Sequence, residues 1–373
     1  APQVDYRAAL RTLPVIDAVS AYRDDPTDYE LLQQGFEDPE IHAQWGYISG
    51  DETFSVPSLL VDTWYDYGVS FSLSLVRQIA KSSPASHLVI APGAHCNTEG
   101  AFDSGAVGDI SVSAAARISF DTMYLDFMDF HLRGQGDAKL PPFQTYVLPE
   151  DTWLASNAWP PADATPRKYF LVEDELSLSP PSNETNRRFS SNPSDPIPSL
   201  GGALCCTGDP DSRSGPVMQN AIEGREDLLI YTSSPMAEAL RIAGPLKAHL
   251  NVTANVPDTD LILRMTDVDP DGNSILIQEG ALRLRYRERF TDPKLMVPGE
   301  TYQVEISMRD IAYKLQVGHR LRLHIAGSSF PRLARNMNTG GIPYAESKPV
   351  TAIIDIRSSA QMPSHITLFE LAD

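Results

Sequence analysis

The fold is decided by two matching stretches, Val56-Pro57-Ser58-Leu59-Leu60-Val61-Asp62-Thr63-Trp64-Tyr65-Asp66-Tyr67-Gly68 and His87-Leu88-Val89-Ile90-Ala91-Pro92-Gly93-Ala94-His95-Cys96. In each, a short apolar run ends in a turn-like cluster, which indicates a buried strand that stops at a loop. The residues between them follow a helical pattern, because Val69, Leu73, Val76 and Ile79 recur at spacings of three and four. Strand, helix and strand in this order predict a parallel βαβ unit.

Each predicted strand is followed by one residue that can carry out acid-base chemistry, Asp66 after the first and His95 after the second. The two strand ends of a βαβ unit lie at one edge of the sheet, which is where open α/β sheets bind their ligands. Taken singly, Asp66 could cap the following helix and His95 could be an ordinary loop histidine. Taken together, in the order acid and then histidine, they match the last two members of an α/β-hydrolase triad. We therefore expect them to form a hydrogen-bonded pair.

The third member of such a triad, the nucleophile, is missing from the sequence. No Gly-x-Ser-x-Gly elbow occurs in the 373 residues, although Gly68-Val69-Ser70-Phe71-Ser72 and Gly46-Tyr47-Ile48-Ser49-Gly50 come near the pattern. Cys96 directly follows His95, and this adjacency argues against a triad-like contact between the thiol and the imidazole. The sequence thus offers an acid and a base without their partner.

Composition restricts the class of protein. The chain is 42% hydrophobic and 21% charged, as in ordinary globular proteins. Its net charge of −19 argues against nucleic acid or an anionic membrane as a partner. No apolar run approaches the ~20 residues that a membrane-spanning helix needs. The three cysteines, Cys96, Cys205 and Cys206, are too few for a disulfide scaffold. The compartment is left open, with the cytoplasm favoured over a secreted or periplasmic location.

Pattern and punctuation divide the chain into three regions. Residues 1–50 are polar and helical in pattern, and are broken by prolines as expected where helices stop. Residues 51–137 hold the βαβ unit, a Gly- and Ser-rich loop over 97–108 and a long helical pattern over 110–132, closed by Gly134-Gln135-Gly136.

From residue 138 to residue 373 the pattern is that of an all-β domain. Short β-rich runs alternate with turns, as in a sandwich or jelly roll. The runs cover residues 143–148, 167–172, 227–232, 246–252, 261–267, 280–286, 301–308, 320–326 and 350–356.

Two candidate metal sites are weaker than their structural alternatives. Asp267-Val268-Asp269-Pro270-Asp271-Gly272 imitates the start of a calcium loop, but its twelfth position is Gln278 where a bidentate acid is expected. Strand-like flanks favour a hairpin turn instead. His319 and His324 lie close together on one predicted strand and its turn, but lack a third ligand. We expect no metal and no cofactor.

Several motifs resemble one family of enzymes. Trp64-Tyr65-Asp66, Ala91-Pro92-Gly93-Ala94-His95, Pro193-Ser194-Asp195-Pro196-Ile197-Pro198-Ser199-Leu200-Gly201-Gly202, Glu223-Gly224-Arg225 and Gly318-His319-Arg320 are similar to segments of the cocaine esterase and X-prolyl dipeptidyl peptidase (CocE/NonD) group of serine hydrolases. The likeness spans nearly the whole chain. Asp62-Thr63 departs from the family pattern, in which glycines are usual before the tryptophan.

The resemblance implies an α/β-hydrolase portion with part of a helical cap, followed by a jelly roll. It implies that Asp66 is the triad acid and His95 the base, and that the serine and the oxyanion hole precede residue 1. The chain is then the C-terminal portion of an ester or amide hydrolase, inactive alone, whose partners are a small ester or amide substrate and the upstream segment.

Three questions stay open at this point. One alternative is an X-prolyl dipeptidyl peptidase, which needs an acidic clamp that the sequence does not identify. Another is a non-catalytic protein that binds its ligand through the β-sandwich, because such folds host many functions. Whether the chain forms a homo-oligomer is also open.

Overall fold

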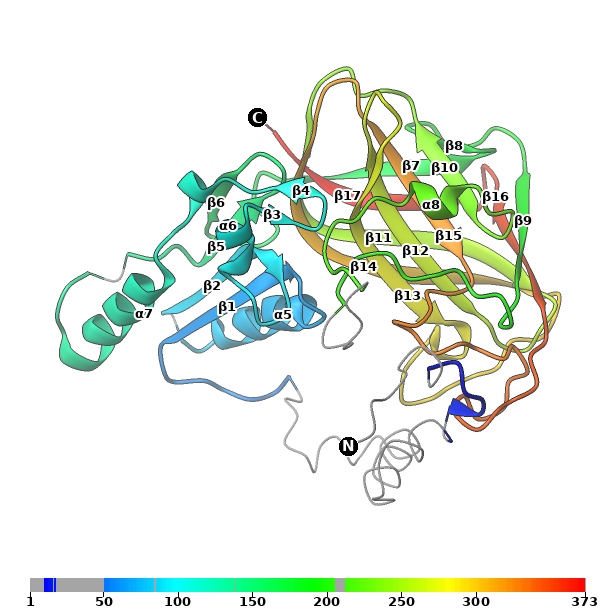
Figure 1. Cartoon of the computed structure of the whole chain (residues 1–373), viewed down its shortest axis with the longest axis horizontal. Coiled ribbons are helices and arrows are strands. Elements are labelled where there is room, and N and C mark those ends of the chain that lie inside the picture. The colour runs from blue at the N-terminus through cyan, green and yellow to red at the C-terminus, as the bar shows by residue number, and fades with distance from the viewer. Residues whose placement is uncertain are drawn as a thin grey trace.

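A computed structural model describes residues 10–15, 17, 50–83, 85–137, 139–204 and 212–372. They form a smaller part with strands and helices and a larger part made almost entirely of strands (Figure 1). The helical region predicted over 1–50 falls almost wholly outside the described residues, as do Cys205 and Cys206. No helix among the described residues is long and apolar enough to cross a membrane.

The smaller part is organised around the predicted βαβ unit. Strand β1 (Ser58–Tyr65) leads through helix α5 (Val69–Ile79) to strand β2 (Ser86–Ala94), and β1 and β2 are parallel neighbours. The four apolar positions predicted to form one face of the helix are all buried. The sheet continues with β5 (Phe143–Val147), parallel to β2, and β6 (Thr152–Ser156), antiparallel to β5.

The segment between β2 and β5 differs from its predicted form. The loop expected over 97–108 contains helix α6 (Gly100–Ser104) and β3 (Ala106–Val107), which pairs with β4 (Ile110–Ser111). The long helix expected over 110–132 is wrong in its first third. A 3-10 turn, η1 (Ala114–Ala116), is followed by α7 (Phe120–Met128) and a π turn, η2 (Asp129–Arg133).

Two serines explain the late start of α7. The side chains of Ser113 and Ser119 accept hydrogen bonds from the backbone N–H groups of Ala115 and Thr122, so each caps a new turn and interrupts the helical pattern. The predicted end is confirmed, because Gly134 stops the helical segment in the left-handed conformation, at a φ of 64°.

The larger part is one sheet of eleven strands in the order β13-β12-β15-β10-β8-β7-β17-β11-β16-β9, with β14 paired to β11. Its strands are β7 (Thr165–Val172), β8 (Glu175–Ser177), β9 (Thr185–Ser191), β10 (Leu229–Ser233), β11 (Leu240–Ala254), β12 (Asp260–Val268), β13 (Ser274–Arg283), β14 (Thr301–Leu315), β15 (Arg320–Ala326), β16 (Ala352–Ser358) and β17 (His365–Leu371). A short helix, α8 (Asn220–Glu223), precedes β10, and a 3-10 turn, η3 (Leu284–Tyr286), follows β13.

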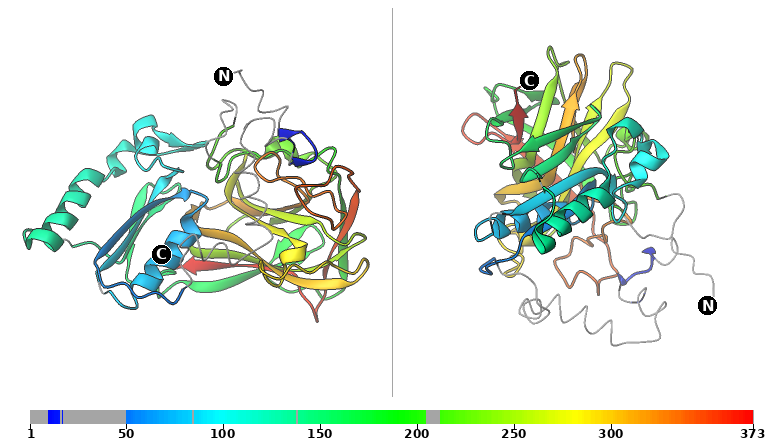
Figure 2. Two further views of the ribbon diagram at one scale, coloured as in Figure 1. Left: turned by 90° about the horizontal axis from the view of Figure 1, so that it is seen from below. Right: turned by 90° about the vertical axis from the view of Figure 1, so that its left-hand side faces the viewer.

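The sheet curls round a common interior (Figure 2). Gly280 of β13 lies so close to β14 that a Cβ atom there would stand 2.1 Å from the carbonyl oxygen of Ser307, so the first strand of the order returns against β14. Leu250, Leu263 and Leu323, from three different strands, are among the buried residues that fill the interior.

Each of the nine predicted runs corresponds to a strand. The run predicted over 320–326 coincides with β15, and the other eight runs each overlap a strand. The run over 280–286 extends too far, because β13 ends at Arg283. There the carboxylate of Asp258 accepts the N–H of Arg285 (2.9 Å) and turns the chain into η3.

The two parts are joined by hydrogen bonds from the end of β1 to the large sheet. The side-chain amide of Gln278 on β13 donates to the carbonyl oxygen of Trp64 (2.8 Å), and the hydroxyl of Tyr65 donates to the carbonyl oxygen of Ile277 (3.0 Å). The indole of Trp159 donates to the carboxylate of Asp310 on β14 (2.8 Å). Trp64 and Tyr65, the residues just before Asp66, are therefore fixed to β13 of the large sheet.

Candidate active site

Asp66 and His95 meet because the residues before them are strand partners. Tyr65, the last residue of β1, pairs with Ala94, the last residue of β2, in a parallel ladder. The next residue of each strand leaves the sheet at the same edge. There the Nδ1 atom of His95 lies 2.6 Å from Oδ2 of Asp66. The structure thus forms the pair for which the sequence supplied only the order.

The carboxylate of Asp66 is held by both oxygens. Oδ1 accepts the backbone N–H of Gly68 (2.7 Å), which leaves Oδ2 directed at His95. This is the Asx-turn geometry that an Asp-x-Gly sequence favours, and it is a signal that was present in the sequence. The alternative role of Asp66 as a helix cap is not what the structure shows, since α5 begins without a side-chain cap.

The imidazole of His95 is held in place by its neighbours. The ring of Tyr67 lies over it at a centroid distance of 4.6 Å, and the side chain of His95 is 22% exposed. One ring nitrogen faces Asp66, so Nε2 is the atom available to a reacting group. An Nδ1–H that donates to a carboxylate leaves Nε2 free to accept a proton.

Cys96 is the residue that the sequence argument placed wrongly. Its Sγ atom lies 3.2 Å from Nε2 of His95, so adjacency in sequence does not prevent the contact. The backbone makes it possible, because Cys96 adopts a φ of 56°, in the left-handed region that few residues other than glycine enter. The thiol is exposed and stands against the nitrogen that a triad nucleophile would use.

Gly93 allows the turn after β2 to pack closely against β1. A Cβ atom at this position would stand 2.5 Å from the carbonyl oxygen of Asn97 and 3.0 Å from Cγ2 of Thr63. The turn after β2 therefore folds back over Gly93, where Asn97 donates its N–H to the carbonyl oxygen of Ala94 (3.1 Å). Only a residue without a side chain fits between β1 and this turn.

A second carboxylate, Asp62, lies near the pair without bonding to the histidine. Oδ1 of Asp62 accepts the N–H of Thr63 at 2.7 Å. Burial raises the pKa of Asp62, although hydrogen bonds from Ser72 and Thr63 oppose the rise, and the charge of Asp66 adds to it. Asp62 occupies the position at which the sequence departs from the family's glycines.

The candidate metal positions take structural roles. Asp267–Gly272 turns the chain between β12 and β13, and Oδ1 of Asp269 accepts the N–H groups of Asp271 and Asn273 (2.9 Å each). Across the described ranges, no group of three or more His, Cys, Asp or Glu side chains could hold a metal ion.

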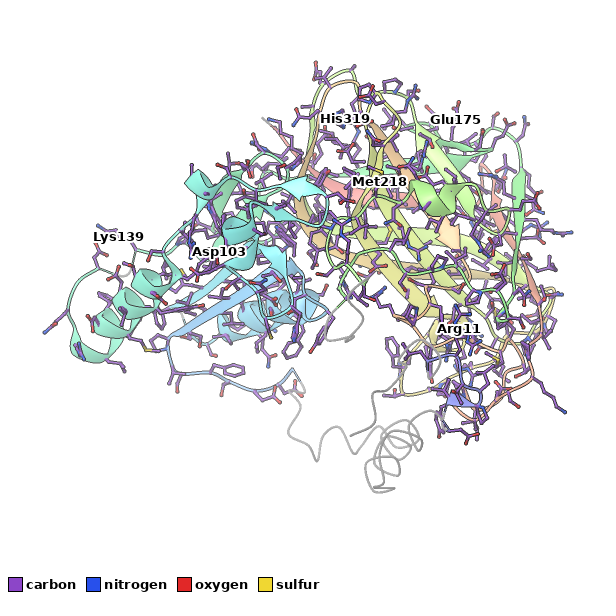
Figure 3. The ribbon with its side chains drawn as sticks, viewed as in Figure 1. Arg11, Asp103, Lys139, Glu175, Met218 and His319 are labelled. Atoms are coloured by element: carbon purple, nitrogen blue, oxygen red, sulfur yellow. The ribbon has the colours of Figure 1, made fainter. Side chains whose placement is uncertain are left out.

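The two histidines of the large sheet are bound to different carboxylates. His319, in the turn at the top of the view in Figure 3, pairs with Asp267 (2.8 Å). His324 pairs with Glu223 (2.9 Å). Each imidazole therefore fastens one segment of the β-rich part to another, as expected for structural histidines.

A match to a family model shows which protein family the chain belongs to. The model for the X-Pro dipeptidyl-peptidase C-terminal non-catalytic domain matches residues 136–367, which is more than half of the chain. The chain belongs to this family. The predicted resemblance is confirmed by a sequence relative as well. The cocaine esterase of Rhodococcus sp. (strain MB1 Bresler) is 32% identical over 357 residues, which cover 91% of this chain and 61% of the esterase.

Solved structures share the fold. An aminopeptidase from a marine sediment Thaumarchaeota archaeon matches with a TM-score of 0.85 and 22% identity, over 98% of this chain and 64% of its own. An alpha-amino acid ester hydrolase matches with a TM-score of 0.83, 22% identity and the same coverages. The present chain spans less than two thirds of the length of each of these three relatives.

Proposed function

We propose that this chain is part of a serine hydrolase that cleaves ester or amide bonds, with Asp66 as the triad acid and His95 as the base. One observation carries the proposal: Nδ1 of His95 lies 2.6 Å from Oδ2 of Asp66 at the joined ends of two parallel strands. Relatives whose names describe a cocaine esterase and an alpha-amino acid ester hydrolase support it. The βαβ unit then belongs to an α/β-hydrolase fold, and the curled sheet to a jelly roll.

In this proposal each residue of the pair has its own role. Nε2 of His95 removes the proton from the attacking hydroxyl and later gives it to the leaving group. Asp66 holds the imidazole in the required tautomer and stabilises its positive form. Gly68 holds Asp66 through the hydrogen bond to Oδ1, and the ring of Tyr67 packs against the imidazole of His95.

The nucleophile and the oxyanion hole belong, in this proposal, to the segment that precedes the present sequence. Two observations support this. No nucleophile elbow occurs in the 373 residues, and the relatives are considerably longer than the chain. In an α/β-hydrolase the serine comes before the acid and the histidine along the chain. The chain alone should therefore be inactive.

Cys96 provides a second candidate nucleophile. Its Sγ atom, 3.2 Å from Nε2 of His95, is already at the distance from which an imidazole accepts a thiol proton. On this alternative His95 takes the thiol proton, and Sγ attacks the carbonyl carbon and forms a thioester. The C–O or C–N bond breaks, the alcohol or amine leaves with that proton, and water then hydrolyses the thioester and restores the thiol, all by residues of this chain. The first proposal is favoured because the relatives are longer than the chain and so have room for an upstream nucleophile.

Active-site labelling separates the two candidates. A fluorophosphonate probe should label no serine in the present chain, and one serine when the coding sequence immediately upstream is included. His95→Ala should abolish that labelling. Labelling of a serine within the 373 residues would refute the missing-nucleophile argument. Retention of all ester hydrolysis in the chain alone, and its loss in Cys96→Ala, would establish the thiol alternative.

The substrate class needs a panel of esters, acyl amides and X-Pro amides tested on the complete enzyme. Activity restricted to X-Pro amides would identify a dipeptidyl peptidase. Turnover of none of these compounds, together with an upstream sequence that lacks a Gly-x-Ser-x-Gly after a strand, would favour the non-catalytic binding protein instead.

A further inference from the structure

Strand β1 is the outermost strand of the smaller sheet, and its side away from β2 is an open edge. The sheet runs in the order β1-β2-β5-β6, so β1 has a single strand partner among the described residues. The N–H of Ser58 donates to the carbonyl oxygen of Ala85 (2.8 Å), on the side of β2. The backbone groups of successive strand residues point to opposite sides, so those of Leu59 and Val61 point to the open edge.

The apolar side chains of β1 are less covered than those of its neighbour. Leu60 and Val61 are half-buried, whereas their strand partners Leu88 and Val89 on β2 are at most 1% exposed. Parallel strands normally lie inside a covered sheet, and an open edge with apolar side chains favours pairing with a further strand. Strand β1 therefore has the composition of an inner strand at the position of an outer one.

Helix α7 and the turn η2 carry two apolar stripes, of which one is exposed. Met123 and Phe127 belong to the buried stripe. Leu125, Met128 and Leu132 also recur at spacings of three and four, but they are 64%, 52% and 78% exposed. We call these three residues the second stripe. Figure 1 shows α7 at the outer end of the smaller part, on the side away from the large sheet. An exposed apolar stripe of this kind is typical of an interface.

We propose that the open edge of β1 and the second stripe of α7 are a docking surface for the segment that precedes this sequence in the complete enzyme, and that a strand of this segment pairs with β1 in parallel. The inference rests on the proposed function, because the docked segment is the one to which that function assigns the serine. The relatives supply the length, since more than a third of each lies outside the part that the present chain matches.

The direction of the docked strand follows from the position of the histidine. His95 presents Nε2 at the edge of the sheet where β1 and β2 both end. Parallel strands end at the same edge, so a nucleophile that follows a parallel strand next to β1 emerges on the side of His95. An antiparallel strand would place its carboxyl end at the opposite edge, far from the imidazole.

The carboxylate of Asp62 marks where the pairing ends. The N–H of Thr63 is the next one on the open edge, and Oδ1 of Asp62 accepts it at 2.7 Å. This donor is therefore not available to an incoming strand. We expect backbone hydrogen bonds to the docked strand at Leu59 and Val61, and none from the N–H of Thr63.

Amide hydrogen exchange in the complete enzyme tests the open edge residue by residue. The N–H groups of Leu59 and Val61 should exchange at least about a hundredfold more slowly than unbonded amides, because the docked strand binds them. The N–H of Leu60 points to β2 and is the matched control, since its protection does not depend on the docked segment. Fast exchange at Leu59 and Val61 beside slow exchange at Leu60 would overturn the proposal.

A photoreactive side chain identifies what covers the second stripe. With p-benzoylphenylalanine in place of Leu132 in the complete enzyme, mass spectrometry of the irradiated protein should find a cross-link to a peptide of the upstream segment. The same replacement at Leu178, which is 56% exposed on the large part, is the control and should give no such cross-link. Cross-links confined to the 373 residues, cross-links to a second copy in an isotope-mixed sample, or no cross-link at all would each overturn the assignment.

Neither measurement requires activity, so the outcomes separate this inference from the proposed function. A labelled serine upstream together with unprotected amides at Leu59 and Val61 would refute the docking surface alone. Protected amides and the expected cross-link without any labelled serine would refute the hydrolase proposal and support the docking surface.

Discussion

At the scale of single residues, the candidate site is a short chain of contacts in which each group orients the next. Gly68 holds Asp66, Asp66 holds His95, and His95 presents Nε2 to Cys96. The order of these contacts matters for the proposed chemistry, because it is Asp66 that bonds to Nδ1 of the imidazole.

Replacing the acid tests this order directly. In the complete enzyme, Asp66→Asn should keep the fold but reduce kcat by up to about 10⁴-fold, the loss seen when the equivalent aspartate of a serine protease is changed. The reason is that an amide stabilises the wrong imidazole tautomer. Steady-state kinetics with an ester substrate measure the effect.

Asp62→Asn is the matched control for that variant. Asp62 lies on the same strand and near the same pair, but its carboxylate bonds to the N–H of Thr63 and not to His95. A reduction of less than about tenfold is expected, since neutralising a nearby carboxylate that does not bond to His95 leaves the hydrogen bond between Asp66 and His95 intact. Equal losses in the two variants would contradict the role assigned to Asp66.

Site residues could be predicted from the sequence where they directly follow a recognisable strand. Asp66 and His95 could be predicted because each directly follows a strand whose end is visible as a change from apolar to turn residues. The contact of Cys96 could not, because it requires a left-handed backbone at a residue other than glycine.

At the scale of elements, the site depends on how tightly the end of β2 folds against β1. Gly93 lies at the crossing, where Thr63 approaches from one side and the turn at Asn97 from the other. A side chain at this point must push the two strand ends apart.

Gly93→Ala should therefore lower the free energy of unfolding by about 1–3 kcal/mol, the usual effect of overpacking a closed position. The kcat of the complete enzyme should also fall, because moving the strand ends apart lengthens the distance between Asp66 and His95. Urea unfolding and kcat measure the two effects. Gly224→Ala is the control, because a Cβ atom there meets nothing within 4 Å.

Strands and helices were predictable where periodicity was strong. The apolar stripe of α5 and the alternation in β15 each extend over a whole element, and both elements were found. Short strands such as β8, with three residues, carry too little pattern to be seen. The helix predicted over 110–119 was wrong because the apolar periodicity continues through Ser113 and Ser119, whose side chains cap new turns.

At the scale of the whole molecule, buried ion pairs fasten the loops of the large part to its sheet. Glu223, at the end of α8, receives Arg322 (2.6 Å) and His324 (2.9 Å), both from β15. Although burial opposes it, the hydrogen bonds from His324, Ser274 and Arg322 lower the pKa of Glu223 to about 2. Burial lowers the pKa of His324, so the imidazole donates to Glu223 in its neutral form.

These values predict a pH dependence of stability. The folded-state pKa of Glu223 lies below its ordinary value of 4.5, so the contribution is complete above pH 4.5 and is lost as the pH falls towards 2. Glu223→Gln should cost about 2–3 kcal/mol of unfolding free energy at pH 7. The difference from the wild type should shrink steadily below pH 4.5.

Urea unfolding at pH 7, 4 and 3 measures this difference. Glu184→Gln provides the comparison, because Glu184 is 63% exposed and pairs with Arg357 at the surface, where a single ion pair contributes less than about 1 kcal/mol. A constant difference between wild type and Glu223→Gln at all three values would contradict the assignment.

The hydrogen bonds from Gln278 to Trp64 and from Tyr65 to Ile277 carry a consequence for engineering and for evolution. The strand that precedes Asp66 is aligned by the β-rich part, so we expect that the two parts of the chain cannot be exchanged as independent modules. A chimera of the complete enzyme that takes its C-terminal domain from a relative should be active only if that domain also supplies the hydrogen-bond partners of Trp64 and Tyr65. A domain described as non-catalytic is, in this geometry, part of the frame that aligns the acid.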